Sequence, residues 1–312
     1  MGNTTRQTNN GNNTIKKEKA ESRNIYAAID IGSNAIRLLV SNVERYPNET
    51  LYKKLAYIRV PLRLGEDVFT QGFISEKKQE QFIEAMKGFL HLMNAYGVKA
   101  YRACATSAMR EASNGKELIE ATAEKAGVSI DLINGKEEAE IIFRGGMSET
   151  MDPNKSYLYL DVGGGSSEFS VYCNHRRTES CSFKVGTVRW IKEAVEPEEL
   201  KKMKKWLKNN CKQYMPTVLI GTGGNINKAK GLLGKKENET ITYTELKILY
   251  DYIRSFSYEE RIHILQLNPS RADVIVPALK IFLMTMKSCK INELIIPKSG
   301  LSDGIIRELS YR

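Results

Sequence analysis

Two copies of one local pattern constrain this chain most: an apolar strand that ends in an aspartate, then glycine and polar residues. One copy is Asp30-Ile-Gly-Ser-Asn34, after the apolar segment 25–31; the other is Asp161-Val-Gly-Gly-Gly-Ser166, after 158–162. Glycine permits positive φ values and lets backbone N–H groups approach an anion closely. A hairpin with a flexible tip would explain one copy. Two copies 131 residues apart predict two related lobes that face a common cleft.

Carboxylates stand beside the second turn. Asp161 and Glu168 bracket it, and Ser166 and Ser167 add hydroxyl donors within it. Glycine N–H groups and hydroxyls suit a phosphate, but two carboxylates share its space only when a metal ion is also bound. The turn therefore predicts a site for a phosphate and a metal ion, with a simple hairpin as the alternative.

A third glycine loop follows another apolar strand. Residues 217–225 form a strand that runs into Gly-Thr-Gly-Gly-Asn, and a helix is predicted over 226–233. The N-terminus of a helix favours an anion. The remaining pattern alternates strands with helices and leaves 61–67 irregular. Strands are predicted at 51–60, 99–104, 128–133 and 293–296, and helices at 75–96, 115–126, 136–146, 187–194, 197–210, 244–256, 257–265, 274–287 and after 300.

The overall composition is that of a soluble globular protein. The 312 residues suit two domains of about 150 residues each. No apolar run is long enough to cross a bilayer. The net charge of +10 favours polyanionic partners such as nucleotides, nucleic acid or phosphate polymers, and a solvated lysine-rich surface explains it equally well.

The N-terminus and the cysteines indicate the compartment. Residues 1–24 are rich in Asn, Thr, Lys and Glu, lack the hydrophobic segment of a secretory signal, and are predicted to be a disordered leader. The five cysteines are scattered and form no CxxC pair. This pattern favours reduced thiols in a cytoplasmic protein over a disulfide framework or a zinc site.

Seven segments together resemble the exopolyphosphatase/guanosine pentaphosphate phosphohydrolase (Ppx/GppA) family, within the actin-like ATPase superfold. They occur in the family's order and cover nearly everything after residue 24. Several are generic alone, and the set is what is specific. The segments are AAIDIGSNAIRLLV (27–40), ATSAMREASNG (105–115), INGKEEAEIIFRG (133–145), LYLDVGGGSSEFSV (158–171), LIGTGGNINKAKGL (219–232), RADVIVPAL (271–279) and SGLSDGII (299–306).

The resemblance implies an α/β fold of two ribonuclease-H-like, actin-like ATPase domains. Each would be a mixed five-stranded sheet flanked by helices, with the active site in the cleft between them. The N-terminal domain would comprise 25–134 with 301–312, and the C-terminal domain 135–300. Some family members carry further C-terminal helical domains that bind long polymer. This chain stops at Arg312, so a processive grip on long polyphosphate is not expected.

By the same resemblance, Glu138 would be the catalytic base, with Glu137 as its close rival. Both lie in the first turn of a predicted helix, where the helix dipole favours acids, and this is the structural alternative. Asp30, Asp161 and Glu168 would hold or orient Mg²⁺, or another divalent cation, directly or through water. Cleaving a phosphoanhydride with water needs both a base for the nucleophile and neutralisation of the phosphoryl oxygens.

The turns and one arginine would bind phosphate. Arg110 would pair with phosphate through its guanidinium fork, or alternatively be a surface helix residue paired with Glu111. The loop that contains Gly223 matches one that contacts nucleotide in actin-like kinases. The implied phosphate-binding residues are Gly32, Ser33, Asn34, Arg110, Gly163, Gly164, Gly165, Ser166 and Gly223. Basic residues that could lengthen an anion track are Arg63, Lys136, Arg144, His175, Arg176 and Arg177.

The sequence therefore predicts a Mg²⁺-dependent exopolyphosphatase that releases the terminal phosphate of inorganic polyphosphate. The alternative substrate is guanosine pentaphosphate, which would lose its 5′ γ-phosphate and link the enzyme to the stringent response. Expected partners are polyphosphate or guanosine penta- and tetraphosphate, without membrane or nucleic acid, and a homodimer is left open. An actin-fold kinase is disfavoured by the context of Glu138, and a non-catalytic alarmone sensor by the four intact acids.

Overall fold

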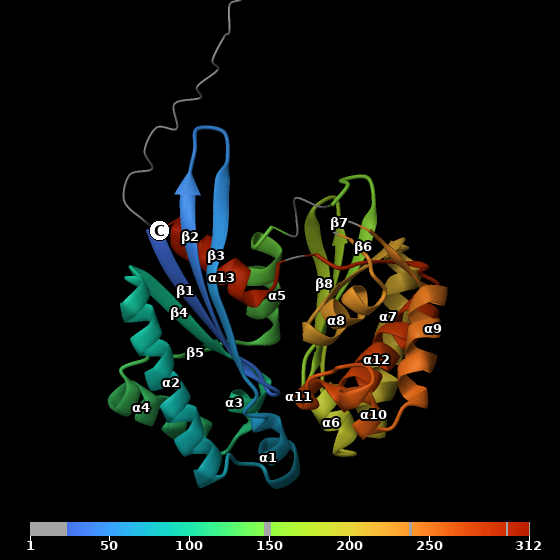
Figure 1. Ribbon diagram of the computed structural model, residues 1–312. Coiled ribbons are helices and arrows are strands. Elements are labelled where there is room, and N and C mark those ends of the chain that lie inside the picture. Colours follow the sequence, from blue (N-terminus) through green and yellow to red (C-terminus); the bar gives the residue numbers. More distant parts are fainter. Residues whose placement is uncertain (1–23, 147–150, 237–238, 298, 312) are drawn as a thin grey trace, which may run out of the picture.

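Two mixed sheets with helices around them form the two lobes of the protein (Figure 1). The structure, a computed structural model, describes residues 24–146, 151–236, 239–297 and 299–311. The predicted leader lies outside these residues except for Asn24, which begins the first strand. Among the described residues, no helix is both long and apolar enough to cross a membrane.

The first sheet has the strand order β3-β2-β1-β4-β5. Its first three strands form an antiparallel meander, and β4 and β5 extend the sheet in parallel to β1. The strands are β1 (Asn24–Ile31), β2 (Ile36–Arg45), β3 (Thr50–Val60), β4 (Ala100–Ala105) and β5 (Asp131–Leu132). The turn from β1 to β2 contains the first glycine motif, so the motif projects from the end of a buried strand.

The second sheet repeats this plan. In the order β10-β11-β9-β6-β7-β8, the meander β6-β7-β8 corresponds to β1-β2-β3, and β9 and β11 run parallel to β6. A two-residue strand, β10, makes this a six-stranded sheet where five strands were predicted. The strands are β6 (Ser156–Val162), β7 (Ser167–Cys173), β8 (Arg176–Phe183), β9 (Val218–Thr222), β10 (Ile241–Thr242) and β11 (Glu293–Ile295).

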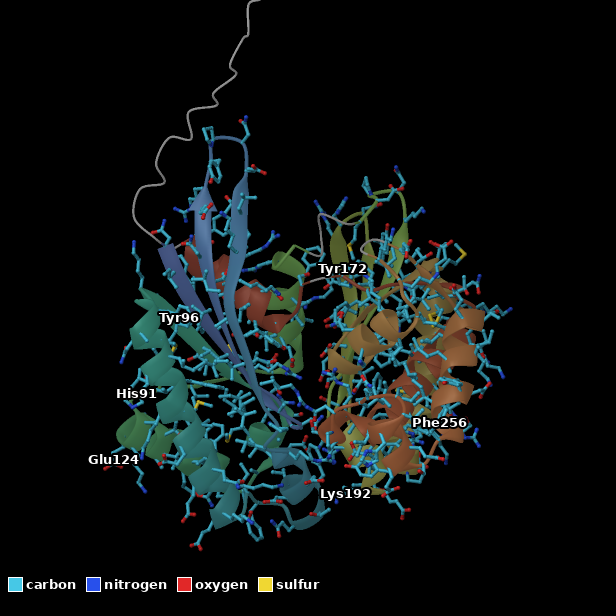
Figure 2. The ribbon with its side chains drawn as sticks, viewed as in Figure 1. His91, Tyr96, Glu124, Tyr172, Lys192 and Phe256 are labelled. Atoms are coloured by element: carbon cyan, nitrogen blue, oxygen red, sulfur yellow. A yellow bond between two sulfur atoms is a disulfide. The ribbon has the colours of Figure 1, made fainter. Side chains whose placement is uncertain are left out.

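Helices cover the outer face of each sheet (Figure 1). Those of the first lobe are α1 (Leu64–Gln71), α2 (Glu76–Tyr96), α3 (Ser107–Glu111) and α4 (Gly115–Ala126). Those of the second lobe are α6 (Thr187–Ile191), α7 (Pro197–Tyr214), α8 (Gly224–Leu232), α9 (Tyr243–Ser255), α10 (Tyr258–His263), α11 (Pro269–Ala272) and α12 (Ile275–Cys289). His91 of α2 lies on the outer surface, away from the cleft (Figure 2).

Two further helices, α5 (Gly135–Arg144) and α13 (Leu301–Ser310), pack against each other between the two sheets. They cross closely, because a Cβ atom added to Gly304 would lie 2.2 Å from the carbonyl oxygen of Ile141. One apolar cluster runs from Ala28 of β1 through these helices to Tyr159 of β6. The division of the chain at residues 134 and 300 stays a prediction.

The structure corrects two local expectations. Residues 64–71 form α1, where 61–67 were predicted to be irregular. Arg63, just before the helix, has φ 53°, so the backbone is irregular only up to the start of α1. The strand predicted over 128–133 is only two residues long, β5. The predicted helix at 257–265 is confirmed as the shorter α10, which Ser257 and Glu260 cap reciprocally.

The cysteines also differ from expectation. Cys211 of α7 and Cys289 of α12 form a disulfide, whereas reduced thiols were predicted. Cys104, Cys173 and Cys181 are free. No local pattern indicates this pair, because the two cysteines are 78 residues apart and meet only when α7 packs on α12.

Candidate active site

The glycine turns of the two lobes touch each other. A Cβ atom added to Gly164 would lie 2.8 Å from the Cβ of Ser33 and 3.4 Å from the backbone nitrogen of Asn34. Ser33 is held from behind, since its hydroxyl lies 2.9 Å from that of Ser107 and its carbonyl accepts a hydrogen bond from the N–H of Gly65 at 2.8 Å. The predicted common cleft is therefore present, and both turns form part of one wall.

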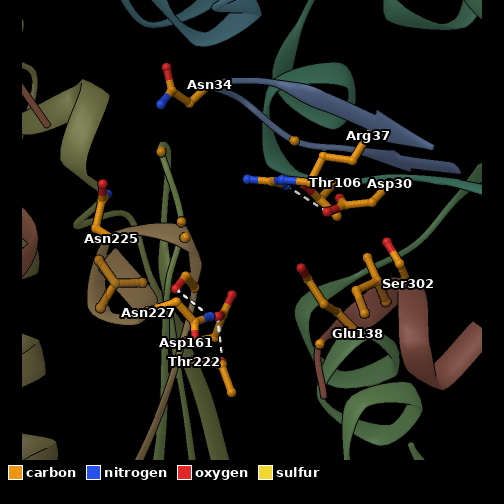
Figure 3. Close-up of a pocket in the computed structure, with 18 of the residues that line it drawn as sticks. Asp30, Asn34, Arg37, Thr106, Glu138, Asp161, Thr222, Asn225, Asn227 and Ser302 are labelled. Atoms are coloured by element: carbon orange, nitrogen blue, oxygen red, sulfur yellow. Dashed lines mark hydrogen bonds and ion pairs between the residues drawn. The ribbon is translucent and has the colours of Figure 1, made fainter. Parts of the chain in front are cut away.

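A cavity of about 520 Å³ opens at this junction (Figure 3). It collects the predicted base, the three predicted metal-binding acids and most of the predicted phosphate-binding residues. Those that line it are Asp30, Gly32, Ser33, Asn34, Glu138, Asp161, Gly163, Gly164, Ser166, Glu168 and Gly223. Arg110 and Gly165 do not line it.

Glu138 faces the cavity from α5. The side chain of Asn134 caps this helix by accepting hydrogen bonds from the N–H groups of Lys136 and Glu137, so Glu138 lies in the first turn with a fixed direction. Desolvation raises the pKa of Glu138 well above its ordinary value, and the charges of Glu168, Asp161 and Asp30 raise it further. The proton affinity of Glu138 is therefore elevated.

Glu168 and Asp161 occupy the second-lobe side of the cavity. Glu168 is 4% exposed and accepts hydrogen bonds from the hydroxyls of Ser166 and of Ser182, the latter at 3.2 Å. Burial and the charge of Asp161 raise the pKa of Glu168 to about 7. The hydroxyl of Thr222 donates to Asp161 at 2.5 Å (Figure 3). Burial raises the pKa of Asp161 and Thr222 opposes that shift.

The donor set of the cavity fits a divalent cation. Burial is the main reason that the pKa values of Asp161, Glu168 and Glu138 are raised, and a neighbouring carboxylate adds to each of these shifts. A cation bound among these carboxylates would favour their charged forms. The amide oxygen of Asn34 is buried without a hydrogen-bond partner. In the part of the chain that the structure describes, however, no three His, Cys, Asp or Glu side chains are gathered tightly enough to hold one ion. Direct coordination by Asp30, Asp161 and Glu168 together stays a prediction.

Three arginines that the sequence analysis did not assign also line the cavity: Arg37, Arg59 and Arg271. Arg37 pairs with Asp30 at 2.6 Å and lies opposite Arg59 in the β2–β3 ladder. The outer Nη2 atoms of Arg37 and Arg271 lie 3.8 and 3.7 Å from the position of a Cβ on Gly224. Burial, with the charges of Arg37 and Arg271, lowers the pKa of Arg59 to about 10, so positive charge is concentrated in this corner.

The alternation of side chains along β2 is the one sequence pattern that could have placed Arg37 in this corner. Arg37 is the cross-strand partner of Asp30, which places both side chains on one face of the sheet. Arg271 was noticed only as part of a family segment, because nothing local shows that it reaches across to Gly224.

The other predicted residues have structural contacts outside the cavity. Arg110 is exposed and donates to the carbonyl of Ile133 at 2.8 Å, yet its charge is near enough to lower the pKa of Glu138 and Glu168. Gly165 is a packing residue, because a Cβ there would lie 2.3 Å from the ring of Phe69.

The proposed anion track is not continuous with the cavity. Arg63 pairs with Glu66 and with Asp273, and Arg177 pairs with Glu140. Lys136 and Arg144 line a second cavity of about 530 Å³. His175 and Arg176 are exposed at the turn between β7 and β8.

The third glycine loop closes the cavity on the second-lobe side. Gly223 has φ 111° and precedes α8; a Cβ there would lie 3.0 Å from the carbonyl oxygen of Val162, so the position requires glycine. Asn225 and Asn227 of α8 add amide groups to the lining (Figure 3). The N-terminus of α8 thereby faces the corner that contains Arg37 and Arg271.

Two solved structures have this fold. An exopolyphosphatase from Cytophaga hutchinsonii superposes with a TM-score of 0.79 at 23% identity, covering 91% of this chain and 97% of that one. A Ppx/GppA family member from Aquifex aeolicus gives a TM-score of 0.73 at 23% identity, covering 93% and 98%. At these identities the likeness shows the fold.

Sequence comparison places the chain in a family. It is 29% identical over 285 residues to a bifunctional 3-dehydroquinate synthase/phosphatase from Fusobacterium nucleatum, covering 83% of this chain and 42% of that protein. It is 25% identical over 304 residues to a guanosine-5′-triphosphate,3′-diphosphate pyrophosphatase from Vibrio cholerae, covering 93% and 60%. The chain thus spans about half the length of these relatives. The model of the Ppx/GppA phosphatase family matches residues 47–311, and the protein belongs to that family.

Proposed function

We propose that this chain hydrolyses phosphoanhydride bonds and releases the terminal phosphate of inorganic polyphosphate with the help of a divalent cation. The observation that carries the proposal is the position of Glu138. Its carboxylate, with a raised pKa, faces a cavity whose opposite wall is built from the glycine turns of both lobes. A base on one side and backbone N–H donors on the other are what attack by water on a phosphoryl group requires.

Each group has a separate role in this proposal. The N–H groups of Ser33, Asn34, Gly164 and Ser166 would bind the oxygens of the terminal phosphoryl group, since those of Gly32 and Gly163 donate within their own turns. Glu138 would accept a proton from the attacking water. Mg²⁺, near Asp30, Asp161 and Glu168, would neutralise the charge on the phosphate oxygens.

The arginine corner would hold the rest of the substrate. Arg37, Arg59 and Arg271 lie along the same cavity as Glu138, and guanidinium groups bind phosphate oxygens in pairs. A chain of phosphates could therefore extend from the glycine turns to this corner. Arg37 also pairs with Asp30, which links the corner to the proposed metal site.

Guanosine pentaphosphate is the second candidate substrate. The relative from Vibrio cholerae is named for action on that nucleotide. The arginine corner suits a second group of phosphates as well as it suits the next units of a polymer. Both substrates would be cut by the same chemistry at the glycine turns.

A phosphate-release assay on the purified chain ranks the two. Polyphosphate and guanosine pentaphosphate are supplied in parallel, with Mg²⁺ or with EDTA. We expect Mg²⁺-dependent orthophosphate release, faster per enzyme with polyphosphate. Release from neither substrate would refute the hydrolase, and release undiminished by EDTA would refute the role of the metal.

A further inference from the structure

Among the described residues that line the cavity, Tyr57 is the only aromatic one. It belongs to β3, the edge strand of the first sheet, and 57% of its surface is exposed. Leu39 of β2 pairs with it across the ladder, so its backbone is fixed. An exposed aromatic ring at the wall of a polar cavity gains little from the fold and is available to a ligand.

The strand places Tyr57 beside the arginine corner. Arg59 is two residues along β3 and therefore points to the same face of the sheet. Tyr57 is an electrostatic neighbour of Arg37, Arg59 and Arg271, and all four side chains line the same cavity. One end of the cavity thus combines cationic groups with an aromatic surface.

We propose that Tyr57 is a specificity-determining residue whose ring stacks on the base of a purine nucleotide while the neighbouring arginines bind the phosphates. Inorganic polyphosphate consists only of phosphate units and has no face for an aromatic ring. A purine has such a face, and an aromatic side chain can stack on it. The inference rests on the proposed function, because it assigns a substrate class to the same cavity.

The polar lining of the same cavity supports a nucleoside rather than a bare aromatic ligand. Asn225 and Asn227 offer amide donors and acceptors, and Ser302 and Asp303 of α13 add a hydroxyl and a carboxylate. Lys54, also on β3, pairs with Asp303 at 2.8 Å, which holds β3 against α13 at the cavity edge. The base, its ribose and its phosphates would each meet groups of matching chemistry.

Matched ligands separate stacking from phosphate binding. GTP and inorganic tripolyphosphate carry three phosphates each and differ in the nucleoside. Their dissociation constants are measured by titration calorimetry with Mg²⁺, in a Glu138→Gln background so that neither ligand is cut. We expect Tyr57→Ala to weaken the binding of GTP relative to that of tripolyphosphate by at least about fivefold. Tyr57→Phe should keep the ratio of the two dissociation constants found with Tyr57, because phenylalanine still stacks.

Tyr252→Ala is the matched control, since Tyr252 is 52% exposed on α9 and does not line the cavity. It should leave the ratio unchanged. If Tyr57→Ala leaves the ratio of the two dissociation constants unchanged, the proposal is overturned. It is also overturned if Tyr57→Ala and Tyr57→Phe weaken the binding of both ligands equally, because Tyr57 would then act as a hydroxyl donor to phosphate. Failure of the proposed function appears separately, as absence of phosphate release by the wild-type protein.

Discussion

Gly164 of the second lobe lies against Ser33 of the first, so closely that a Cβ on Gly164 would be 2.8 Å from the Cβ of Ser33. The two glycine turns are therefore one surface built from both lobes. The close packing of these two turns contributes to the spacing of backbone donors across the cleft.

A methyl group at Gly164 should separate the turns. The added atom would also meet Cγ2 of Val188 at 3.2 Å, so the wall around it leaves no room. Because misplacing donors by about 1 Å costs on the order of 100-fold in rate, we expect Gly164→Ala to lower kcat/KM for phosphate release by 10- to 100-fold. Gly88→Ala in α2 is the control: a Cβ there meets nothing within 4 Å, and activity should be unchanged. Equal activity in the two variants would contradict the claim that the packing of Gly164 against Ser33 positions the backbone donors.

Arg189 joins the second turn to the first lobe. Its Nε donates to the carbonyl of Gly165 at 3.0 Å, its Nη2 bonds both carboxylate oxygens of Glu111, and its guanidinium lies 4.0 Å above the ring of Phe69. The side chain is almost fully buried. We expect Arg189→Ala to destabilise the protein by about 2–4 kcal/mol, measured by urea unfolding.

A surface pair supplies the control for that measurement. Lys201 and Glu198 of α7 pair at 2.7 Å with both side chains about 70% exposed. Exposed pairs contribute little, so Lys201→Ala should leave the unfolding midpoint nearly unchanged. If Arg189→Ala and Lys201→Ala lower the free energy of unfolding by similar amounts, Arg189 does not join the lobes.

Glu168 should make the metal-free protein less stable as pH rises. Burial and Asp161 raise its pKa to about 7 in the folded state, from 4.5 in the unfolded chain. Between pH 4.5 and 7 the folded protein holds a proton that the unfolded chain has released, so stability falls through this range and the contribution of Glu168 is fully lost above pH 7. In EDTA at pH 8, the free energy of unfolding of Glu168→Gln should exceed that of wild type by on the order of 2 kcal/mol in urea unfolding, and the two should be equal at pH 4. A variant less stable than wild type at pH 8 would contradict this.

The disulfide should stabilise the fold without affecting the chemistry. Cys211 and Cys289 join α7 to α12 outside the cavity and close a loop of 78 residues. Thiol titration of the unreduced, denatured protein should find three free thiols rather than five. Replacing both cysteines with serine should cost about 2–5 kcal/mol in urea unfolding and leave kcat unchanged. Five titratable thiols would show that the bond does not form.

The sequence predicted the parts of the site that lie on local patterns. The glycine turns and the acids beside them are each determined by a few consecutive residues, and Glu138 was assigned from the family resemblance. All of these except Gly165 line the cavity. The two-lobe architecture followed from the repetition of one turn, and it is confirmed by two sheets of the same plan, the second extended by β10.

The parts that sequence missed depend on contacts between distant segments. Arg271 reaches the cavity only because α11 packs beside the first lobe, and Cys211 meets Cys289 only across two helices. Gly165 was assigned to phosphate like its neighbours, although its backbone packs against Phe69. A run of glycines does not reveal which member faces a ligand and which faces the core.

The most direct test of the account compares Glu138→Gln with Glu137→Gln. Both replacements remove one negative charge from the same helical turn, but Glu137 pairs with Arg102 at 2.8 Å outside the cavity. Orthophosphate release from polyphosphate is measured with saturating Mg²⁺. We expect Glu138→Gln to lower kcat by about 10²–10⁴ and Glu137→Gln to change it less than about twofold. A loss below about tenfold in Glu138→Gln, or an equal loss in both variants, would contradict the assignment of Glu138 as the base.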